Sequence, residues 1–366
     1  MASSSSHMDK AAGAPATTRS KGLSLLVAAV RNHKDIYRVD LKLIDAASGA
    51  LVGKMDGQRI GKLLATGGLI CHVPTHRTTL RVLNPATGSV NHVPAGTTTT
   101  TKNTVGHDAA RQISSSSYVL GQIPNTIEYK VLRIYTPDRD YRHTQSCEIL
   151  TLDGSGDYIW RPAQSPLLPV DTSIARHGAV AQGFVHFFMA LHGLSISRVG
   201  KYNGIASFDL AKEEWKPSLL PTPITVDERN CNHDSLSLVE LNGCLVFVYH
   251  DYLNFCINLW MLEDLAKGKW LKMECIQFGS VMLGWREPDK SLPVTLRAIQ
   301  VRWPGEIFAL PLMVLDDGCI VFWVQHPYGA VRVFDPKTRG YKNVVNMGKI
   351  CNIFGKYKTG QVGFTL

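Results

Sequence analysis

The chain has 366 residues, of which 45% are hydrophobic and 19% charged, and its formal net charge is +9. This composition is normal for a globular protein with a large buried core, and all-β repeat folds of this length can form one domain. No apolar run approaches the roughly 18 residues of a helix that spans a bilayer, so we expect no association with a membrane. Because lysine and arginine occur mostly as single residues between apolar positions, the charge indicates a solvated basic surface. We expect no nucleic-acid partner; an acidic protein partner is the alternative.

The first 23 residues are predicted to lie outside the folded domain. Residues 1–8 contain no apolar core and resemble the remnant of an expression tag, and residues 9–22 are rich in Ala, Thr, Gly and Pro, as is typical of a disordered lead-in. No secretory signal is found among them. We therefore expect one folded domain over residues 24–366.

Eight cysteines are spread along the chain without any C-x-x-C spacing, and several lie inside apolar strand patterns, as at Cys244 and Cys319. Reduced cysteine is a small, well-packing core residue. We expect buried thiols in a cytoplasmic or nuclear protein, rather than the disulfide framework of a small secreted chain.

The first of two recurring sequence marks is a strand that ends in an Asp or Asn turn and is followed by a return strand. Alternating apolar residues make a half-buried strand, the Asp or Asn side chain caps the turn, and a residue such as Trp215 lies on the return strand. The mark recurs about every 58 residues on average, at Asp45, Asn84, Asp153, Asp209, Asp264 and Asp335.

The second mark is a glycine-centred hairpin upstream of the first. Asn-Gly and Asp-Gly between apolar runs are strong hairpin signals because both turn residues tolerate positive φ. The hairpins lie at 66–70, 182–185, 242–245 and 317–320.

Six marks about 58 residues apart, close to the roughly 50-residue period of kelch repeats, predict an all-β fold, a six-bladed, kelch-like β-propeller with N- and C-terminal strands closing the ring. Residues 350–364 are expected to supply the closing strand against the N-terminal hairpin. Helix content should be very low, with one helical turn over Leu259–Lys267. A pair of packed sheets would explain the strands but not the regular alternation of the two marks.

With the repeats laid out, the sequence resembles the F-box-associated domain of plant F-box proteins from about residue 60 to residue 345. The similarity is fairly specific when its motifs occur together in this order. They are Gly68–Cys71, Leu83–Gly88 (LNPATG), Tyr129–Ile134, Cys147–Trp160, Gly183–His186, Ile205–Leu210 with Glu214 and Trp215, and Leu259–Asp264 with Trp270.

The resemblance implies a monomeric recognition domain that recruits a target protein to a Skp–cullin–F-box ubiquitin ligase. Family members usually carry an N-terminal F-box, a short helical module with a Leu-Pro start that binds the Skp adaptor. No such module precedes Ser24. Either the F-box was removed, in which case Skp and cullin bind through a segment not seen in this chain, or the protein works without the adaptor.

Motifs that would indicate catalysis are missing from the sequence. There is no P-loop, no G-x-S-x-G elbow and no H-E-x-x-H, and His72 with His76 falls in a strand and loop rather than on a helix. Asp316 and Asp317 precede a glycine and indicate a turn, with a paired-carboxylate active site as the alternative. We therefore predict no enzyme activity, no cofactor and no metal, and a binding module that presents loops on a rigid ring.

The predicted partner-binding residues are aromatic, Arg and His residues in loops, because such side chains dominate interface hot spots. For each, the alternative is an exposed loop or an aromatic that packs between blades. The residues are Arg139, Tyr141, Arg142, Tyr202, Tyr252, Trp285, Arg286, His326 and Tyr328. The stretch 97–117 is expected to be a surface loop. A second function class is a propeller that binds a small molecule or a glycan as a receptor without ligase coupling.

Overall fold

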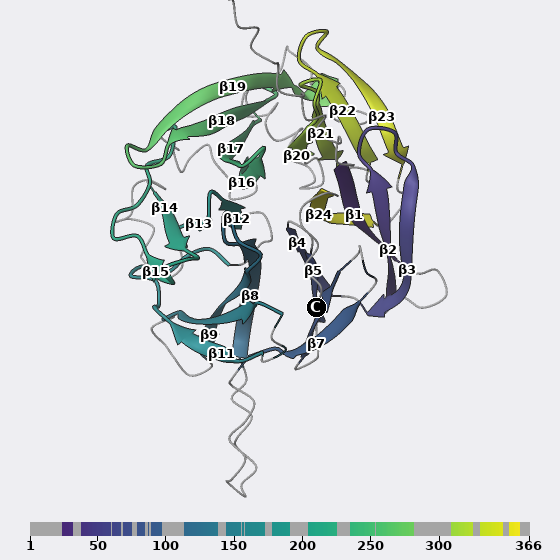
Figure 1. Cartoon of the computed structure of the whole chain (residues 1–366). Helices are drawn as coiled ribbons and strands as arrows, with labels where there is room; N and C mark the ends of the chain where they lie inside the picture. The colour runs from purple at the N-terminus through teal and green to yellow at the C-terminus, as the bar shows by residue number, and fades with distance from the viewer. Residues whose placement is uncertain are drawn as a thin grey trace, which may run out of the picture.

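A computed structural model describes the following residues of the chain: 24–31, 38–59, 61–66, 69–74, 79–84, 87, 89–96, 113–137, 144–154, 156, 158–172, 178–190, 204–224, 235–252, 254–281, 309–324, 330–346 and 351–358. These residues form antiparallel sheets arranged as a ring around a central axis, the architecture of a β-propeller (Figure 1). None of the described residues forms a helix long and apolar enough to cross a membrane.

Four of the sheets have four strands each, in which consecutive strands are hydrogen-bonded neighbours. The first comprises β8 (Ile113–Gln122), β9 (Tyr129–Pro137), β10 (Ser146–Leu152) and β11 (Trp160–Ala163). The second comprises β12 (Gly178–Ala181), β13 (Phe184–Phe188), β14 (Ile205–Asp209) and β15 (Glu214–Trp215). The third comprises β16 (Leu236–Leu241), β17 (Cys244–Asp251), β18 (Cys256–Asp264) and β19 (Lys269–Gln277). The fourth comprises β20 (Ala309–Val314), β21 (Ile320–Val324), β22 (Ala330–Asp335) and β23 (Gly340–Asn346).

The fifth sheet has eight strands in the order β3-β2-β1-β24-β4-β5-β6-β7. Its strands are β1 (Ser24–Arg31), β2 (Arg38–Asp45), β3 (Leu51–Arg59), β4 (Gly61–Thr66), β5 (Leu69–Pro74), β6 (Thr79–Leu83), β7 (Val90–Pro94) and β24 (Cys351–Lys358). The described residues thus form five sheets, whereas the sequence predicted six separate blades. The difference arises because β24 also pairs with β4, in parallel, at Gly355 and Ala65, which joins two runs of four strands.

The C-terminal strand pairs with the N-terminal one. β24 runs antiparallel to β1, from Ser24 opposite Lys358 to Val30 opposite Cys351. The two ends of the described chain therefore meet in one sheet, as predicted for ring closure.

Two predictions about individual segments are wrong. The helical turn expected over Leu259–Lys267 is instead strand β18 followed by a tight turn, and α1 (Phe278–Val281) is the one α-helix among the described residues. Ser114–Ser117, expected in a surface loop, belong to β8, where Ser117 is buried. The segment is a strand because its backbone pairs antiparallel with β9, with Ser115, Ser116 and Ser117 opposite Thr136, Tyr135 and Ile134.

The hydrophobic core lies between neighbouring sheets. Each of its clusters combines side chains from two sheets, as where Phe247 of β17 packs edge-on against Phe188 of β13 at a centroid distance of 5.8 Å. Phe247 has no solvent-exposed surface, and burial of such a side chain contributes roughly 1.5–3 kcal/mol. Each sheet is therefore stabilised mainly by its neighbours in the ring.

The Asp turns of the first sequence mark connect one sheet to the preceding sheet. Oδ1 of Asp209 accepts the N–H groups of Ala211 and Lys212 at 2.9 and 3.0 Å, and Glu213 then adopts a positive φ of 61°. The chain reverses, and the indole N–H of Trp215 donates to the carbonyl oxygen of Gln164 beyond β11 at 2.8 Å. Trp160 and Trp270 make the equivalent bonds to Pro94 and Pro221.

Candidate functional site

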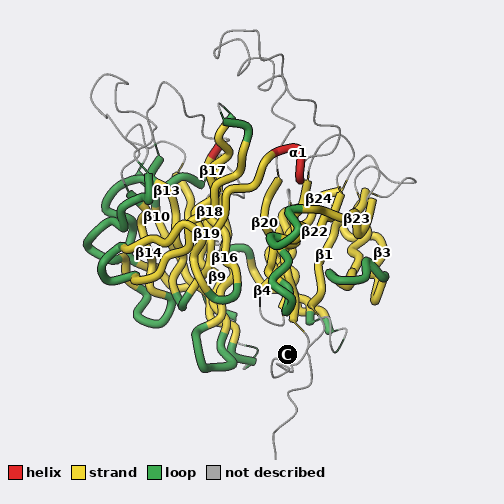
Figure 2. The backbone as a smooth tube through the Cα atoms, turned by 90° about the horizontal axis from the view of Figure 1, so that it is seen from above, coloured by secondary structure: helices red, strands yellow, loops and turns green. Residues whose placement is uncertain are grey.

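The connections at one end of the ring attach to the ends of the second strands of the sheets. We call this end the loop face and define it by the last residues of β9, β13, β17 and β21, which are Pro137, Phe188, Asp251 and Val324. In an antiparallel four-stranded sheet, the connection from the fourth strand to the next sheet emerges at this same end. Helix α1, which follows β19, accordingly lies on the same side as the tip of β17 (Figure 2).

The chain segments predicted to bind a partner all start from this face. Eight of the nine predicted residues lie outside the described residues, and for them partner contact stays a prediction: Arg139, Tyr141, Arg142, Tyr202, Trp285, Arg286, His326 and Tyr328. These eight residues belong to four connections, and the described strand or helix that precedes each connection ends at the loop face.

Tyr252 is the ninth predicted residue and follows the last residue of β17. Its ring stacks on His250 at a centroid distance of 6.2 Å and meets Phe278 of α1 edge-on at 5.6 Å. It is half-buried against the core between the third and fourth sheets. Tyr252 thus contributes to packing beneath the loop face, which is the alternative role stated for these aromatics.

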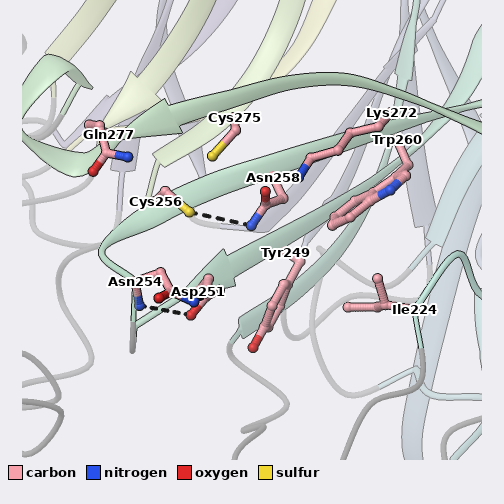
Figure 3. A pocket seen from close by; sticks show the side chains of 10 residues that line it. All are labelled: Ile224, Tyr249, Asp251, Asn254, Cys256, Asn258, Trp260, Lys272, Cys275 and Gln277. Atoms are coloured by element: carbon pink, nitrogen blue, oxygen red, sulfur yellow. Dashed lines mark hydrogen bonds between the residues drawn. The ribbon is translucent and has the colours of Figure 1, made fainter. Parts of the chain in front are cut away.

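A pocket of about 410 Å³ lies beside the loop face, on the side of the third sheet that packs against the second (Figure 3). Its lining combines aromatic rings, amides, two charged groups and two thiols. The lining residues are Ile224, Tyr249, Asp251, Asn254, Cys256, Asn258, Trp260, Lys272, Cys275 and Gln277.

Hydrogen bonds within the described residues fix several of these side chains. Asp251 accepts the backbone N–H of Asn254 at 3.0 Å and its Nδ2 at 2.7 Å. Asn258 is 5% exposed, donates from Nδ2 to Sγ of Cys256 at 3.4 Å, and points its amide oxygen away from that sulfur (Figure 3). Nζ of Lys272 lies 5.3 Å from the ring centroid of Trp260. A planar polar group could lie against the aromatic wall and hydrogen-bond to the amides.

The two thiols differ in their surroundings. Burial and, next, hydrogen bonding with Cys275 raise the pKa of the Cys256 thiol to about 12. Cys275 is half-buried on the neighbouring strand. Cys256 is therefore held as a neutral thiol beside a more accessible one.

The sequence interpretation missed this pocket. The sequence feature that could have predicted the pocket is the alternation of polar residues in the largely apolar strand β18, where Cys256 and Asn258 lie on the same face. The contribution of Ile224, which lies on the connection from the second sheet, could not be read from any local pattern.

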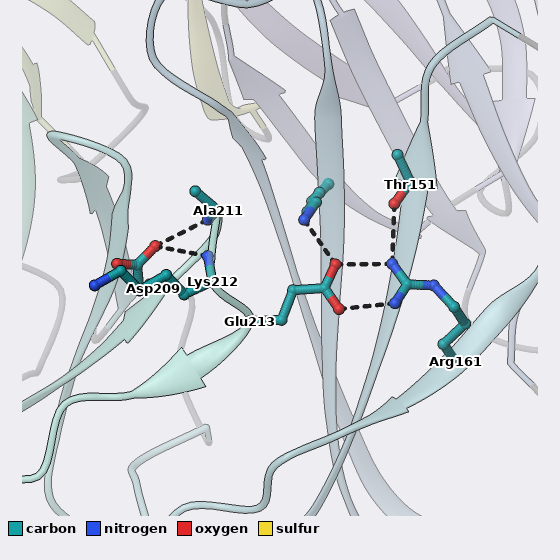
Figure 4. A network of polar contacts seen from close by, with 7 residues as sticks. Thr151, Arg161, Asp209, Ala211, Lys212 and Glu213 are labelled. Atoms are coloured by element: carbon teal, nitrogen blue, oxygen red, sulfur yellow. Dashed lines mark hydrogen bonds and ion pairs between the residues drawn. The ribbon is translucent and has the colours of Figure 1, made fainter.

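A second polar cluster, centred on Glu213, joins two sheets away from the loop face (Figure 4). Its carboxylate accepts two hydrogen bonds from Arg161 of β11, at 2.7 and 2.8 Å, and one from Lys130 of β9 at 2.6 Å. Hydrogen bonding from Arg161 is the main reason why the pKa of Glu213 is lowered. The charged groups of Glu213, Arg161 and Lys130 are bonded to one another, so the cluster connects two sheets and is not a reactive centre.

Among the described residues, no group of three His, Cys, Asp or Glu side chains is placed to hold a metal ion. His72, considered with His76 as a ligand pair, lies fully buried in β5, and His76 is outside the described residues.

Comparison with solved structures shows several matches of low identity. The β-propeller domain of the Trilobed protease from Pyrococcus furiosus is 10% identical, with a TM-score of 0.45, over 90% of this chain and 94% of that one. A protein of unknown function from Bacteroides caccae is 10% identical, with a TM-score of 0.43, over 93% and 99%. These similarities are too distant to carry functional information.

No curated protein matches the chain. The model of one protein family does match, over residues 45–353, and its description is F-box associated beta propeller domain. This range covers most of the chain and includes every Asp or Asn turn of the first mark. The chain therefore belongs to the family of F-box-associated β-propeller domains.

Proposed function

We propose that this domain recognises a target protein on behalf of an F-box ubiquitin ligase and is not an enzyme. The observation that carries the proposal is the family match over residues 45–353. The fold supports it in that the described elements preceding the predicted partner-binding segments end at the loop face, since rigid scaffolds commonly present binding residues on loops.

The proposal extends to the complete assembly. A target held at the loop face would be ubiquitinated by a ligase whose Skp adaptor and cullin bind through an F-box not seen in this chain. The domain would act as a monomer in the cytoplasm or nucleus, and its free thiols at six described cysteines suit such a reducing compartment.

We also propose that the ring has six blades, with the eight-stranded sheet counting as two. Two observations support this number. The run β24-β1-β2-β3 and the run β4 to β7 each have four antiparallel strands, and the parallel β24–β4 contact is limited to one residue pair. The first strands of the six runs, β4, β8, β12, β16, β20 and β24, also contact one another in succession around the ring.

The test is quantitative affinity capture with the full chain from plant extract, followed by mass spectrometry. The loop-face variant combines Arg139→Ala, Tyr141→Ala and Arg142→Ala, and the control is Ile127→Ala, a 53% exposed side chain in the turn between β8 and β9. We expect the loop-face variant to capture at least about tenfold less of the target protein, because hot-spot truncations cost roughly 2 kcal/mol or more of binding free energy. The control should capture normally, and both should keep the wild-type melting temperature.

Each of the nine predicted residues is also replaced singly by alanine. If none of these variants captures less target, the loop face is not the target-binding surface. Repeating the capture with a form that carries an F-box tests ligase coupling, since Skp and cullin subunits should then accompany the target.

The pocket of Figure 3 favours a second candidate function, binding of a small molecule or glycan. Its aromatic wall and buried amide are the kind of lining that orients a polar ligand. A thermal-shift screen with sugars and plant hormones tests it. A ligand present at 100 times its Kd would stabilise the fold by about 2.7 kcal/mol, and a wild-type shift that Asn258→Ala abolishes would favour this function.

A further inference from the structure

Two cysteines occupy neighbouring positions on the ladder between β18 and β19. Cys275 is paired with Asn258 and Cys256 with Gln277, so the two cysteines are diagonal neighbours on one face of the sheet. The Cys275 side chain lies close enough to contribute to the raised pKa of the Cys256 thiol. The other described cysteines lie on different strands or at the opposite end of the same sheet, at Cys71, Cys147, Cys244 and Cys319.

The pair lies at the wall of the 410 Å³ pocket, to which both side chains contribute. Cys256 is 4% exposed, whereas Cys275 is half-buried. The amide of Asn258 donates to Sγ of Cys256 and holds that side chain in place. A small oxidant that enters the pocket therefore meets Cys275 with a second sulfur directly behind it.

We propose that Cys256 and Cys275 form a redox pair, which a peroxide oxidises to an intrachain disulfide and a dithiol reductant restores. The proposal concerns a modification site, goes beyond target recognition and does not depend on it.

The chemistry proceeds in two balanced steps. The Cys275 thiolate attacks one oxygen of the peroxide, the O–O bond breaks, and Cys275 becomes a sulfenic acid as hydroxide or alkoxide leaves and takes up a proton. The sulfur of Cys256 then attacks the sulfenic sulfur, the S–O bond breaks, and water leaves with the Cys256 proton. Two thiols lose two electrons, which the peroxide accepts. Cys256 suits the second role because it is buried, so the peroxide reaches the half-buried Cys275 first.

The strand geometry predicts an easily reduced disulfide. Diagonal neighbours have Cα atoms roughly 7–8 Å apart, whereas disulfides usually join Cα atoms within about 6.8 Å. Closure therefore needs a movement on the order of 1 Å. β19 can supply it, because it is the outer strand with β18 as its one partner, and the ladder is already irregular at Trp260. A strained disulfide is more readily reduced than a relaxed one, as a reversible modification requires.

The experiment treats the reduced full chain with hydrogen peroxide, blocks remaining thiols with N-ethylmaleimide and maps the unreduced tryptic peptides by mass spectrometry. We expect a linked pair formed by the peptides 230–267 and 273–286, with fragment spectra that assign the bond to Cys256 and Cys275. Dithiothreitol should abolish the linked pair. Cys256→Ser and Cys275→Ser should each prevent it.

Cys244→Ser is the matched control, because Cys244 is also half-buried in the third sheet but lies at its opposite end. It should leave formation of the linked peptides unchanged. Oxidation of Cys275 to sulfinic or sulfonic acid without a linked peptide would overturn the proposal, as would a link from Cys275 to a different cysteine. The peptide map of the wild-type chain decides between these outcomes even if a serine variant fails to fold.

Discussion

Replacing His186 with asparagine should remove a large part of the loss of folding stability between pH 7.5 and pH 5. His186 lies fully buried on β13, where its Nδ1 is 2.9 Å from Oγ of Ser207. Burial lowers its pKa from 6.5 to about 4, and the positive charge of Lys216 adds to the effect. Asparagine can keep a hydrogen bond to Ser207 but cannot take up a proton.

The sign follows from proton linkage. Between pH 6.5 and pH 4 the unfolded chain binds a proton at His186 that the folded chain excludes, so stability falls as the pH is lowered through this window. Above pH 6.5 the contribution is fully present. pH 5 lies about 1.5 units below the unfolded-state pKa of 6.5 and still above the folded-state pKa of about 4. At 1.36 kcal/mol per pH unit, the folding stability lost at His186 by pH 5 is therefore about 2 kcal/mol.

The assay is urea unfolding followed by tryptophan fluorescence at pH 7.5, 6.0 and 5.0. Wild-type protein should lose about 2 kcal/mol more between the first and last pH than the His186→Asn variant. His92→Asn, at an exposed position on β7, is the control and should retain the wild-type slope. If His186→Asn loses stability with falling pH as steeply as the wild type, the assignment of this pH dependence to His186 is wrong.

Three further substitutions test how the sheets are held together, each measured by urea unfolding at pH 7.5. Gly96→Ala would place a Cβ 1.7 Å from Nη1 of Arg133 and disturb its buried ion pair with Glu148, so we expect a loss of about 3 kcal/mol or more; Gly243→Ala, with positive φ but open space, should lose about 1 kcal/mol. Trp215→Phe keeps an aromatic ring but removes the N–H donated to Gln164, and should cost about 1–2 kcal/mol; equal stability would show that this bond does not connect the sheets. Glu213→Gln leaves the nearly buried Lys130 without its carboxylate partner and should cost about 2 kcal/mol, whereas Glu214→Gln, at an exposed neighbour, should be neutral.

The repeating Asp turn could be predicted from the sequence because each of its steps is local. Asp209 caps its own turn, Glu213 reverses the chain, and Trp215 follows two residues later. The same spacing holds from Asp264 to Trp270. A pattern of this kind needs no knowledge of the remaining chain, so the strand-rich repeat fold could be inferred from it.

The features that were missed depend on contacts between distant segments. The joining of two runs into one eight-stranded sheet arises where residue 355 meets residue 65. The assignment of Ser114–Ser117 to a strand depends on pairing with β9, which lies beyond a turn. The pocket needs Ile224 from one sheet and Asn258 from the next. Secondary-structure propensity and hydrophobic periodicity describe local sequence, so they contain no information about contacts between residues far apart in the chain.

The two ends of the ring have different roles, which explains why the fold could be predicted from this sequence and the target could not. At the end opposite the loop face, the connections from the third to the fourth strands are tight turns such as those at Asp209, Asp264 and Asp335, and they hold neighbouring sheets together. Glu213 and Arg339, at equivalent positive-φ positions, extend to the preceding sheet, to Arg161 and Glu274. Those positions are restricted by packing, so they form recognisable marks.

The loop face has no such restriction in its sequence. The strands β13 and β14 are separated there by residues 189–204, and α1 and β20 by residues 282–308, whereas the turn from β18 to β19 takes only residues 265–268. Long connections are not needed to close a sheet, so their composition is available for binding a partner. On this argument, exchanging the 138–143 segment for that of another family member should change the captured target and leave the unfolding midpoint unchanged. A change in the midpoint without a change in target would instead place this segment with the structural turns.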